Sequence, residues 1–151
     1  MVRAGSSTRI RESTVEQRVL RSIRRRPGAV VLRSDLRRLG GKSQLTRVLA
    51  KLVTSRKLIR VGHGIYCKTR KNRFTGRLAP AATFEAIVSE VFERLEIDIG
   101  PGKLFREYNA GKSTQIPMQT TITTGARRIR RRLQIGTRTV AYEGVSGRAR
   151  K

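Results

Sequence analysis

Residues 43–68 read SQLTRVLAKLVTSRKLIRVGHGIYCK, and this stretch decides the predicted fold. Its first half repeats apolar residues at three- and four-residue spacing, which is typical of one amphipathic helix. Those positions are Leu45, Val48, Leu49, Leu52 and Val53. In the second half, two apolar runs at 58–61 and 65–68 flank Gly62-His63-Gly64, which predicts a β-hairpin with a three-residue glycine-rich loop. We therefore expect a helix that leads directly into a hairpin.

The opposite face of this helix is polar. At 100° per residue it is centred on Ser43, Arg47, Ala50 and Thr54, with Gln44 and Lys51 at its edges. Small, hydrogen-bonding and cationic groups of this kind suit a DNA major groove. An ordinary solvated surface helix has the same pattern, so the neighbouring segments have to distinguish the two interpretations.

The preceding residues predict three further elements. A capping-box pair, Ser13 and Glu16, opens a first helix that ends near residues 24–26. Residues 29–32 are β-branched and aliphatic, which predicts an edge strand, and Ser34 can cap a brief helix at 35–39. Gly40-Gly41 then gives a tight turn into the helix of the quoted stretch. The order helix, strand, helix, turn, helix, strand, strand is that of a winged helix-turn-helix.

The sequence as a whole predicts an α+β fold, with an N-terminal winged helix-turn-helix followed by a small α+β C-terminal domain of one long helix and antiparallel strands. The long helix carries an apolar stripe from Phe84 to Leu95, and a hairpin is expected about Gly136-Thr137. The predicted boundaries are 1–12 for a flexible basic arm, 13–73 for the winged helix-turn-helix DNA-binding domain, 74–82 for a linker, 83–144 for the small α+β domain with a basic hairpin, and 145–151 for a flexible tail.

The charge points to a polyanionic partner. The chain holds 35 Lys and Arg against 10 Asp and Glu, a net charge of +25. Residues 1–77 carry +19 of this and residues 78–151 carry +6. Arg dominates, and its planar fork grips phosphates and guanine edges. The 7 Phe and Tyr residues are scattered, which favours duplex DNA over single-stranded RNA. No apolar run reaches the length of a spanning helix, so we expect no membrane partner. The single Cys67 is compatible with a reducing cytoplasm, and with DNA as the partner we expect a cytoplasmic, nucleoid-associated protein.

Catalytic and cofactor chemistry finds little support in the residues. With one His and one Cys in the chain, His63 and Cys67, a zinc cluster is not expected. Gly111-Lys112-Ser113-Thr114 lacks the earlier glycine of a P-loop, since residue 106 is Arg. There is no Ser/His/Asp or Cys/His grouping. We therefore expect no enzymatic activity, no metal and no cofactor.

The candidate site residues fall into three groups. For base reading we select Gln44, Arg47 and Lys51. For the DNA backbone we select Lys42, Ser43, Thr54, Arg60, His63, Lys68, Arg70 and Lys71. Arg128, Arg130 and Arg132 would share one face of a strand and form a second basic surface. DNA backbone is one candidate ligand for it, and RNA, the acidic surface of a toxin and no specific ligand are the alternatives.

Particular motifs carry a family resemblance. They are the D-L…L-G-G turn at 35–41, the pattern L-x-R-x-L-x-x-L before R-K-L-I-R, and G-x-G-I-Y at the end of the wing. Through them Asp35–Lys71 resembles the N-terminal winged-helix domain of AbiEi-type antitoxins of abortive-infection, type IV toxin–antitoxin systems, and residues 114–143 resemble the C-terminal part of short members. The resemblance implies a bacterial module that binds repeats in its own promoter and represses it. It also implies a nucleotidyltransferase-like toxin, encoded nearby, as partner.

The sequence thus predicts a sequence-specific repressor of its own operon that binds double-stranded DNA. Three alternatives remain open at this stage: an RNA-binding protein, a non-specific architectural DNA-binding protein, and a protein-directed antitoxin or inhibitor. The residues do not determine the oligomeric state or the operator.

Overall fold

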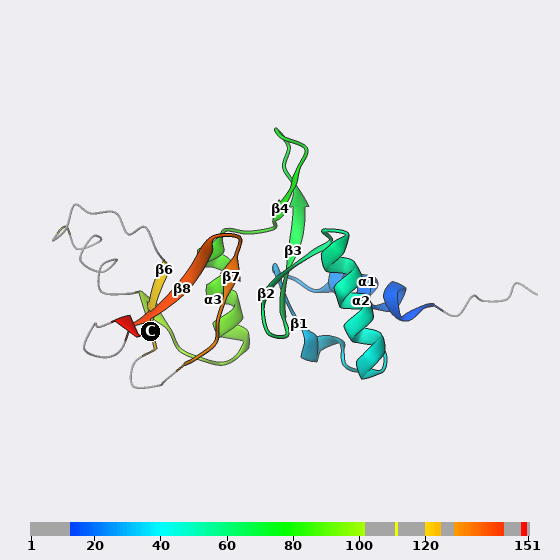
Figure 1. Cartoon of the computed structure of the whole chain (residues 1–151), viewed down its shortest axis with the longest axis horizontal. Helices are drawn as coiled ribbons and strands as arrows, with labels where there is room; N and C mark the ends of the chain where they lie inside the picture. Colours follow the sequence, from blue (N-terminus) through cyan, green and yellow to red (C-terminus); the bar gives the residue numbers. More distant parts are fainter. Residues whose placement is uncertain (1–12, 102–110, 112–119, 125–128, 144–148, 151) are drawn as a thin grey trace, which may run out of the picture.

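The computed structural model describes residues 13–101, 111, 120–124, 129–143 and 149–150. This part of the chain contains helices and two sheets whose strands are mainly antiparallel (Figure 1). The predicted α+β fold is therefore confirmed. The predicted arm at 1–12 lies outside the described residues.

Helix α1 spans Val15–Arg25 and begins one residue later than the predicted capping box implies. The Thr14 hydroxyl accepts a hydrogen bond from the Gln17 backbone N–H at 3.2 Å, and Gln17 Oε1 accepts one from the Thr14 N–H at 3.1 Å. Thr14 and Gln17 satisfy the same sequence rule as Ser13 and Glu16. With Thr14 as the cap, Glu16 lies in the first turn, where a carboxylate is favoured.

The predicted helix at 35–39 is instead a 3₁₀ helix, η1, at Arg33–Leu36. It starts earlier because an Asp35 carboxylate oxygen accepts a hydrogen bond from the Leu32 backbone N–H at 3.0 Å, which closes the turn directly after the strand. Leu36 is fully buried. Helix α2 follows at Lys42–Thr54, close to the predicted bounds.

Strands β1 (Val30–Leu32), β2 (Leu58–Gly62) and β3 (Ile65–Lys71) form an antiparallel sheet in the order β1-β3-β2. Gly62 pairs with Ile65, so the β2–β3 turn consists of two residues and not of the predicted three. The second of them, Gly64, has a φ of +67°, which tight hairpin turns require and which glycine adopts without strain. The turn places His63 at its tip.

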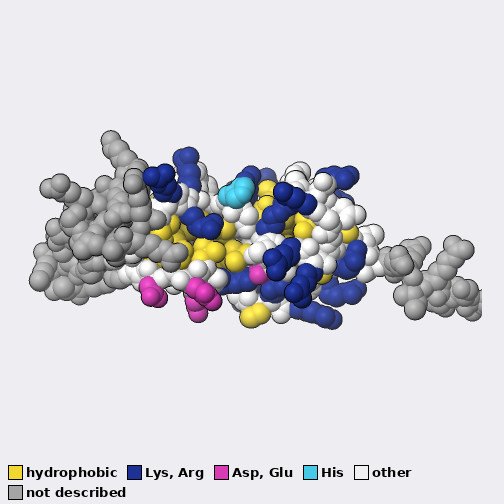
Figure 2. All heavy atoms as spheres, turned by 90° about the horizontal axis from the view of Figure 1, so that it is seen from below, with side chains coloured by type: hydrophobic (Ala, Val, Ile, Leu, Met, Phe, Trp, Pro, Cys, Tyr) yellow, Lys and Arg dark blue, Asp and Glu magenta, His cyan; other side chains and the backbone are white. Residues whose placement is uncertain are grey.

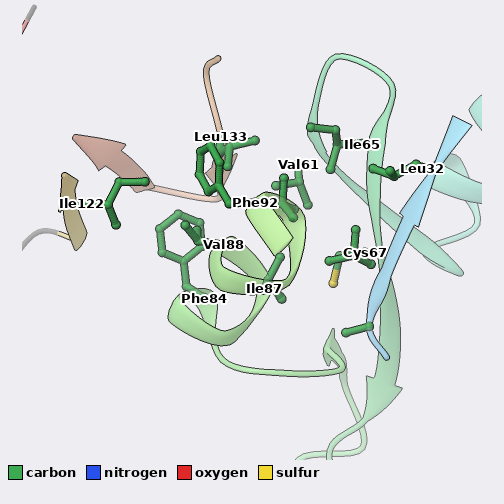
Figure 3. Close-up of a cluster of buried hydrophobic side chains, with 13 residues drawn as sticks. Leu32, Val61, Ile65, Cys67, Phe84, Ile87, Val88, Phe92, Ile122 and Leu133 are labelled. Atoms are coloured by element: carbon green, nitrogen blue, oxygen red, sulfur yellow. The ribbon is translucent and has the colours of Figure 1, made fainter. Parts of the chain in front are cut away.

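The sheet is buried on both faces. One face packs against α1 and α2 through a cluster that contains Val19, Ile23, Val31, Leu36, Leu45, Leu49, Leu52, Leu58 and Tyr66. The other face packs against helix α3 (Phe84–Arg94), with Val61, Ile65 and Cys67 directed toward Ile87, Val88 and Phe92 (Figure 3). Ile122 and Leu133 complete this second cluster. The stretches 13–73 and 83–144 therefore share a hydrophobic cluster, although they were predicted as separate domains.

Helix α3 also covers the edge of strand β1. The Glu90 carboxylate accepts hydrogen bonds from the backbone N–H groups of Ala29 at 3.0 Å and Val30 at 3.1 Å. Arg94 donates to the Val30 carbonyl at 3.2 Å. Backbone groups that an edge strand would otherwise leave unpaired are thus satisfied by side chains of α3.

The predicted linker at 74–82 includes a strand. Strand β4 (Leu78–Pro80) pairs with the end of β3, opposite Thr69 to Lys71. Together they form a hairpin that projects beyond the rest of the molecule (Figure 1).

The C-terminal sheet has the order β5-β6-β8-β7, with β9 on β8. Its strands are β5 at Gly100–Pro101, β6 at Thr120–Thr123, β7 at Gln134–Ile135, β8 at Arg138–Glu143 and β9 at Ala149–Arg150. The predicted hairpin about Gly136-Thr137 is present. Strands β6 and β8 pair in parallel, unlike the other described pairs. Strand β9 falls in the stretch that was predicted as a flexible tail.

Asp35 joins three parts of the fold. Its carboxylate contacts Arg94 of α3 at 2.6 Å and Arg26, which ends α1, at 3.7 Å. Burial alone raises the pKa of Asp35, but the hydrogen bonds from Arg94 and the Leu32 N–H, with the charges of Arg94 and Arg26, lower it below its ordinary value of 3.8. The carboxylate is therefore stabilised in its charged form.

We expect Asp35→Asn to lower the free energy of unfolding by about 1–3 kcal/mol at neutral pH, because it leaves buried donors without a charged acceptor. Since the folded-state pKa lies below the unfolded value, the stabilisation is present above the unfolded value and is lost as the pH falls through the folded pKa. The difference between the two proteins should shrink below about pH 4. Urea unfolding at neutral and acidic pH measures this, and an equal difference at both would contradict the assignment.

Candidate nucleic-acid interface

A groove of about 650 Å³ lies between helix α2 and the β2–β3 hairpin. Its wall on the helix consists of Lys42, Thr46, Ala50, Val53 and Thr54, and its wall on the hairpin side consists of Arg33, Arg60, His63, Gly64 and Tyr66. The groove is therefore lined by cations, hydroxyl groups and small side chains. This combination suits the sugar–phosphate backbone and base edges of a nucleic acid.

Arg33 links the two walls of the groove. Its guanidinium donates to the Lys42 carbonyl at 2.9 Å and to the Thr46 hydroxyl at 2.8 Å. Its backbone N–H donates to the Gly64 carbonyl at 2.9 Å. Arg33 thereby fixes the start of α2 relative to the hairpin turn. Its role is not evident from the sequence, because its partners lie 9 to 31 positions away along the chain.

The outer face of α2 has the predicted orientation. Leu45, Leu49 and Leu52 are buried, whereas Ser43, Arg47, Ala50 and Thr54 are exposed. Arg47 thus stands on the part of the helix that is farthest from the core. Its neighbours on this face have short side chains, so another molecule can approach the helix backbone closely.

Gln44 and Lys51 lie on the α1 side of this face and have partners within the protein. Gln44 Oε1 accepts a hydrogen bond from the Gly41 backbone N–H at 2.9 Å, at the start of the helix. Lys51 Nζ contacts a Glu16 carboxylate oxygen at 2.8 Å, with 67% of the lysine side chain exposed. An exposed ion pair of this kind contributes at most about 1 kcal/mol. Of the three predicted base-reading residues, Gln44 and Lys51 thus have partners within the protein, whereas Arg47 lies at the centre of the exposed face.

The predicted backbone-binding residues divide between two regions. Arg60 and His63 lie beside the groove, together with Lys42 and Thr54. Lys68, by contrast, is half-buried, and its Nζ donates to the Arg26 carbonyl at 2.5 Å. Arg70 and Lys71 are exposed on the projecting β3–β4 hairpin. Lys68 therefore supports the end of α1, whereas the others are accessible.

The C-terminal arginines adjoin the groove. A second hollow is lined by Arg60, Gly62 and His63 on one side and by Arg132, Gln134 and Gly136 on the other. Arg130 and Arg132 are exposed, but they precede β7 and lie outside a strand, so the predicted strand ladder is wrong for these two. Arg128 lies outside the described residues. The second basic surface thus continues the first one, through Arg132.

The segment that carries Arg132 is held by side chains around it. Leu133 is buried in the cluster beneath the sheet, and the Tyr142 hydroxyl donates to the Arg131 carbonyl. Burial raises the pKa of Tyr142 to about 12, although the charge of Arg131 lowers it in part. The phenol is therefore neutral at physiological pH and remains a hydrogen-bond donor.

The segment that forms most of this surface carries charge of one sign. Residues 36–84 hold 13 Lys and Arg and no Asp or Glu. Figure 2 shows basic side chains spread over the face that carries the chain's one histidine, His63. Such a concentration of positive charge attracts polyanions at long range.

Residues 16–149 match the model of a family of unknown function (DUF6088). The chain belongs to this family. No curated protein matches the chain. The description of the family names no activity.

Within the described residues, every helix is too short or too polar to cross a membrane. The same part of the chain holds no group of three or more His, Cys, Asp or Glu side chains placed to bind a metal ion. Cys67 is buried, and burial raises the pKa of its thiol.

The close contact at Gly62 gives a test of how the C-terminal arginines are placed. A Cβ atom at Gly62 would lie 2.7 Å from the Arg132 carbonyl oxygen and 3.2 Å from Leu133 Cδ2. We expect Gly62→Ala to push this segment away and to lower the free energy of unfolding by about 1–3 kcal/mol. His63→Ala, at the neighbouring position in the turn, is the control and should change it by less than about 0.5 kcal/mol. Equal effects in urea unfolding would contradict the packing described.

Proposed function

We propose that this protein is a sequence-specific transcriptional repressor that binds double-stranded DNA. The observation that carries the proposal is the cation-lined groove between the exposed face of α2 and the β2–β3 hairpin. The element order and the sheet order β1-β3-β2 support the interpretation of residues 13–73 as a winged helix-turn-helix. In this interpretation α2 is the recognition helix and the β2–β3 hairpin is the wing.

Helix α2 has the dimensions and side chains for a major groove. An α-helix with its side chains is about 10–12 Å across, and the major groove of B-DNA is about 12 Å wide. Arg47 is the base-reading residue that we rank first, because it is exposed at the centre of the outer face and a guanidinium can donate two hydrogen bonds to guanine. Ser43 and Thr54 contact the flanking phosphates. Gln44 and Lys51 take secondary roles at the edge of the same face.

The wing and the adjoining arginines position the helix. Arg60, His63 and Arg132 surround one hollow beside the wing, so a DNA strand that passes the wing meets all three. Contacts of this kind fix register without reading sequence. Arg33 holds the wing turn and the start of α2 in place, which reduces the ordering required on binding.

The finer part of the proposal concerns biological role. By its resemblance to AbiEi-type antitoxins, we propose that the protein represses its own operon as the antitoxin-like member of a toxin–antitoxin or mobile-element system in the bacterial cytoplasm. A cognate toxin encoded nearby is the protein partner that this role implies. Footprinting on the DNA upstream of its own gene, with random duplex and structured RNA as competitors, tests the proposal. Preference for the RNA, or equal binding to all duplexes, would contradict sequence-specific repression.

Arg47→Ala should weaken specific binding far more than binding to random DNA. A bidentate Arg–guanine contact contributes about 1–3 kcal/mol of discrimination, which is about 5- to 150-fold in affinity. Arg38→Ala is the matched control, since it removes an exposed cation that lies outside α2 and lines neither of the two hollows. Fluorescence anisotropy with operator and random duplexes measures both constants. If Arg47→Ala lowers the two affinities equally, the base-reading assignment is wrong.

Arg130→Ala and Arg132→Ala test the second basic surface through salt dependence. Each phosphate contact that is lost should reduce the slope of log affinity against log salt by about one. We expect the larger change for Arg132, because it lines the hollow with Arg60 and His63. A slope equal to that of the wild type in the double variant would remove this segment from the interface.

A further inference from the structure

The β3–β4 hairpin exposes apolar side chains at an unusual place. Phe74, at its tip, is 96% exposed, and Leu78, on its stem, is 46% exposed. Within the described residues these are the two exposed large hydrophobic side chains, and both lie on this hairpin. A lone exposed apolar side chain needs no explanation, but one at the tip of a projecting element is placed to meet a partner.

The tip is a hydrogen-bonded turn. Asn72 Oδ1 accepts hydrogen bonds from the backbone N–H groups of Phe74 at 2.8 Å and Thr75 at 3.2 Å. The Asn72 N–H donates to the Arg77 carbonyl at 2.8 Å, and the Gly76 N–H donates to the Asn72 carbonyl at 2.9 Å. Gly76 has a φ of +69°, which closes the turn. These bonds fix the backbone of the turn that carries Phe74 before any partner arrives.

Four exposed cations lie within four residues of Phe74 in the sequence: Arg70, Lys71, Arg73 and Arg77. No acidic residue occurs between Asp35 and Glu85 to neutralise them. An apolar wedge flanked by Lys and Arg is the combination with which minor-groove proteins unstack a base step while they hold the adjacent phosphates.

We propose that the β3–β4 hairpin is a second DNA-binding element, in which Phe74 enters the minor groove and inserts between bases while the four cations contact phosphates. The proposal rests on the DNA binding proposed above and extends it to an element outside the α2 groove. Because the wedge is apolar and unstacking is largely sequence-tolerant, the hairpin adds affinity for any duplex. Its preformed turn limits the entropy lost on binding.

The chain contains no Trp, so Phe74→Trp gives a protein whose one indole stands at the tip of the hairpin. In the full chain titrated with random-sequence duplex, we expect the emission of this indole to be quenched by base stacking and to become protected from acrylamide. Leu78→Trp, on the stem of the same hairpin, is the matched control, and its emission should change little. If the Phe74→Trp protein responds no more than the Leu78→Trp protein does, Phe74 does not insert.

Affinity provides the second measurement. Phe74→Ala should weaken binding to random duplex about tenfold, and Phe74→Tyr should retain most of it, because stacking one base on an aromatic ring contributes on this scale. If the chain binds duplex and depends on Arg47 for specificity, but Phe74→Ala binds as the wild type does, the hairpin proposal fails and the proposed function stands. If no protein binds duplex, both fail. If the indole emission of the Phe74→Trp protein changes with anionic phosphatidylserine vesicles and not with DNA, the hairpin binds a lipid surface and the DNA proposal is wrong.

Discussion

Strand β3 is the constraint on which the described fold depends. It lies between β1 and β2, and its successive side chains serve opposite layers: Tyr66 packs with α1 and α2, whereas Ile65 and Cys67 pack with α3. A shift of one residue in its register would exchange the two sets of side chains, so burial on both faces specifies the register strongly. The position of the β2–β3 turn relative to α2 follows from this register. The candidate interface is therefore positioned by the core, although most of its own residues reach the surface.

Two acidic residues of α3 make contacts that hold the fold together. Glu90 pairs with the backbone of the β1 edge, and Glu85 forms an ion pair with Arg138, which also lies over the Phe84 ring at 5.1 Å. These carboxylates thus contact the scaffold, on the side of the sheet away from α2. This separation of charge leaves the surface of α2 and of the β2–β3 hairpin cationic, and it explains why an acidic helix occurs in so basic a chain.

The parts of the structure that were predictable from the sequence depend on short-range patterns. The leucine spacing predicted the orientation of α2 correctly, and the apolar runs about Gly62–Gly64 predicted the β2–β3 hairpin. Both patterns depend on residues that are close together in the sequence. The pairing of Lys51 with Glu16, the bridge made by Arg33 and the approach of Arg132 to Gly62 join residues 9 to 70 positions apart. Such long-range contacts produce no periodic pattern in the sequence. The parallel β6–β8 pair escaped prediction for the same reason.

The charge of the chain links its folding to its binding. Asp35 and Glu85 neutralise Arg26, Arg94 and Arg138, which lie outside residues 36–84. Glu16 pairs with one cation of that stretch, Lys51, and leaves its excess of positive charge large. Repulsion among those cations opposes the compact state, and a polyanion that binds only the folded chain both relieves the repulsion and shifts the equilibrium toward folding. The face that lowers the stability of the free protein is thus the face that we propose for DNA. Under that proposal, DNA binding stabilises the fold through charge alone, before any base is read.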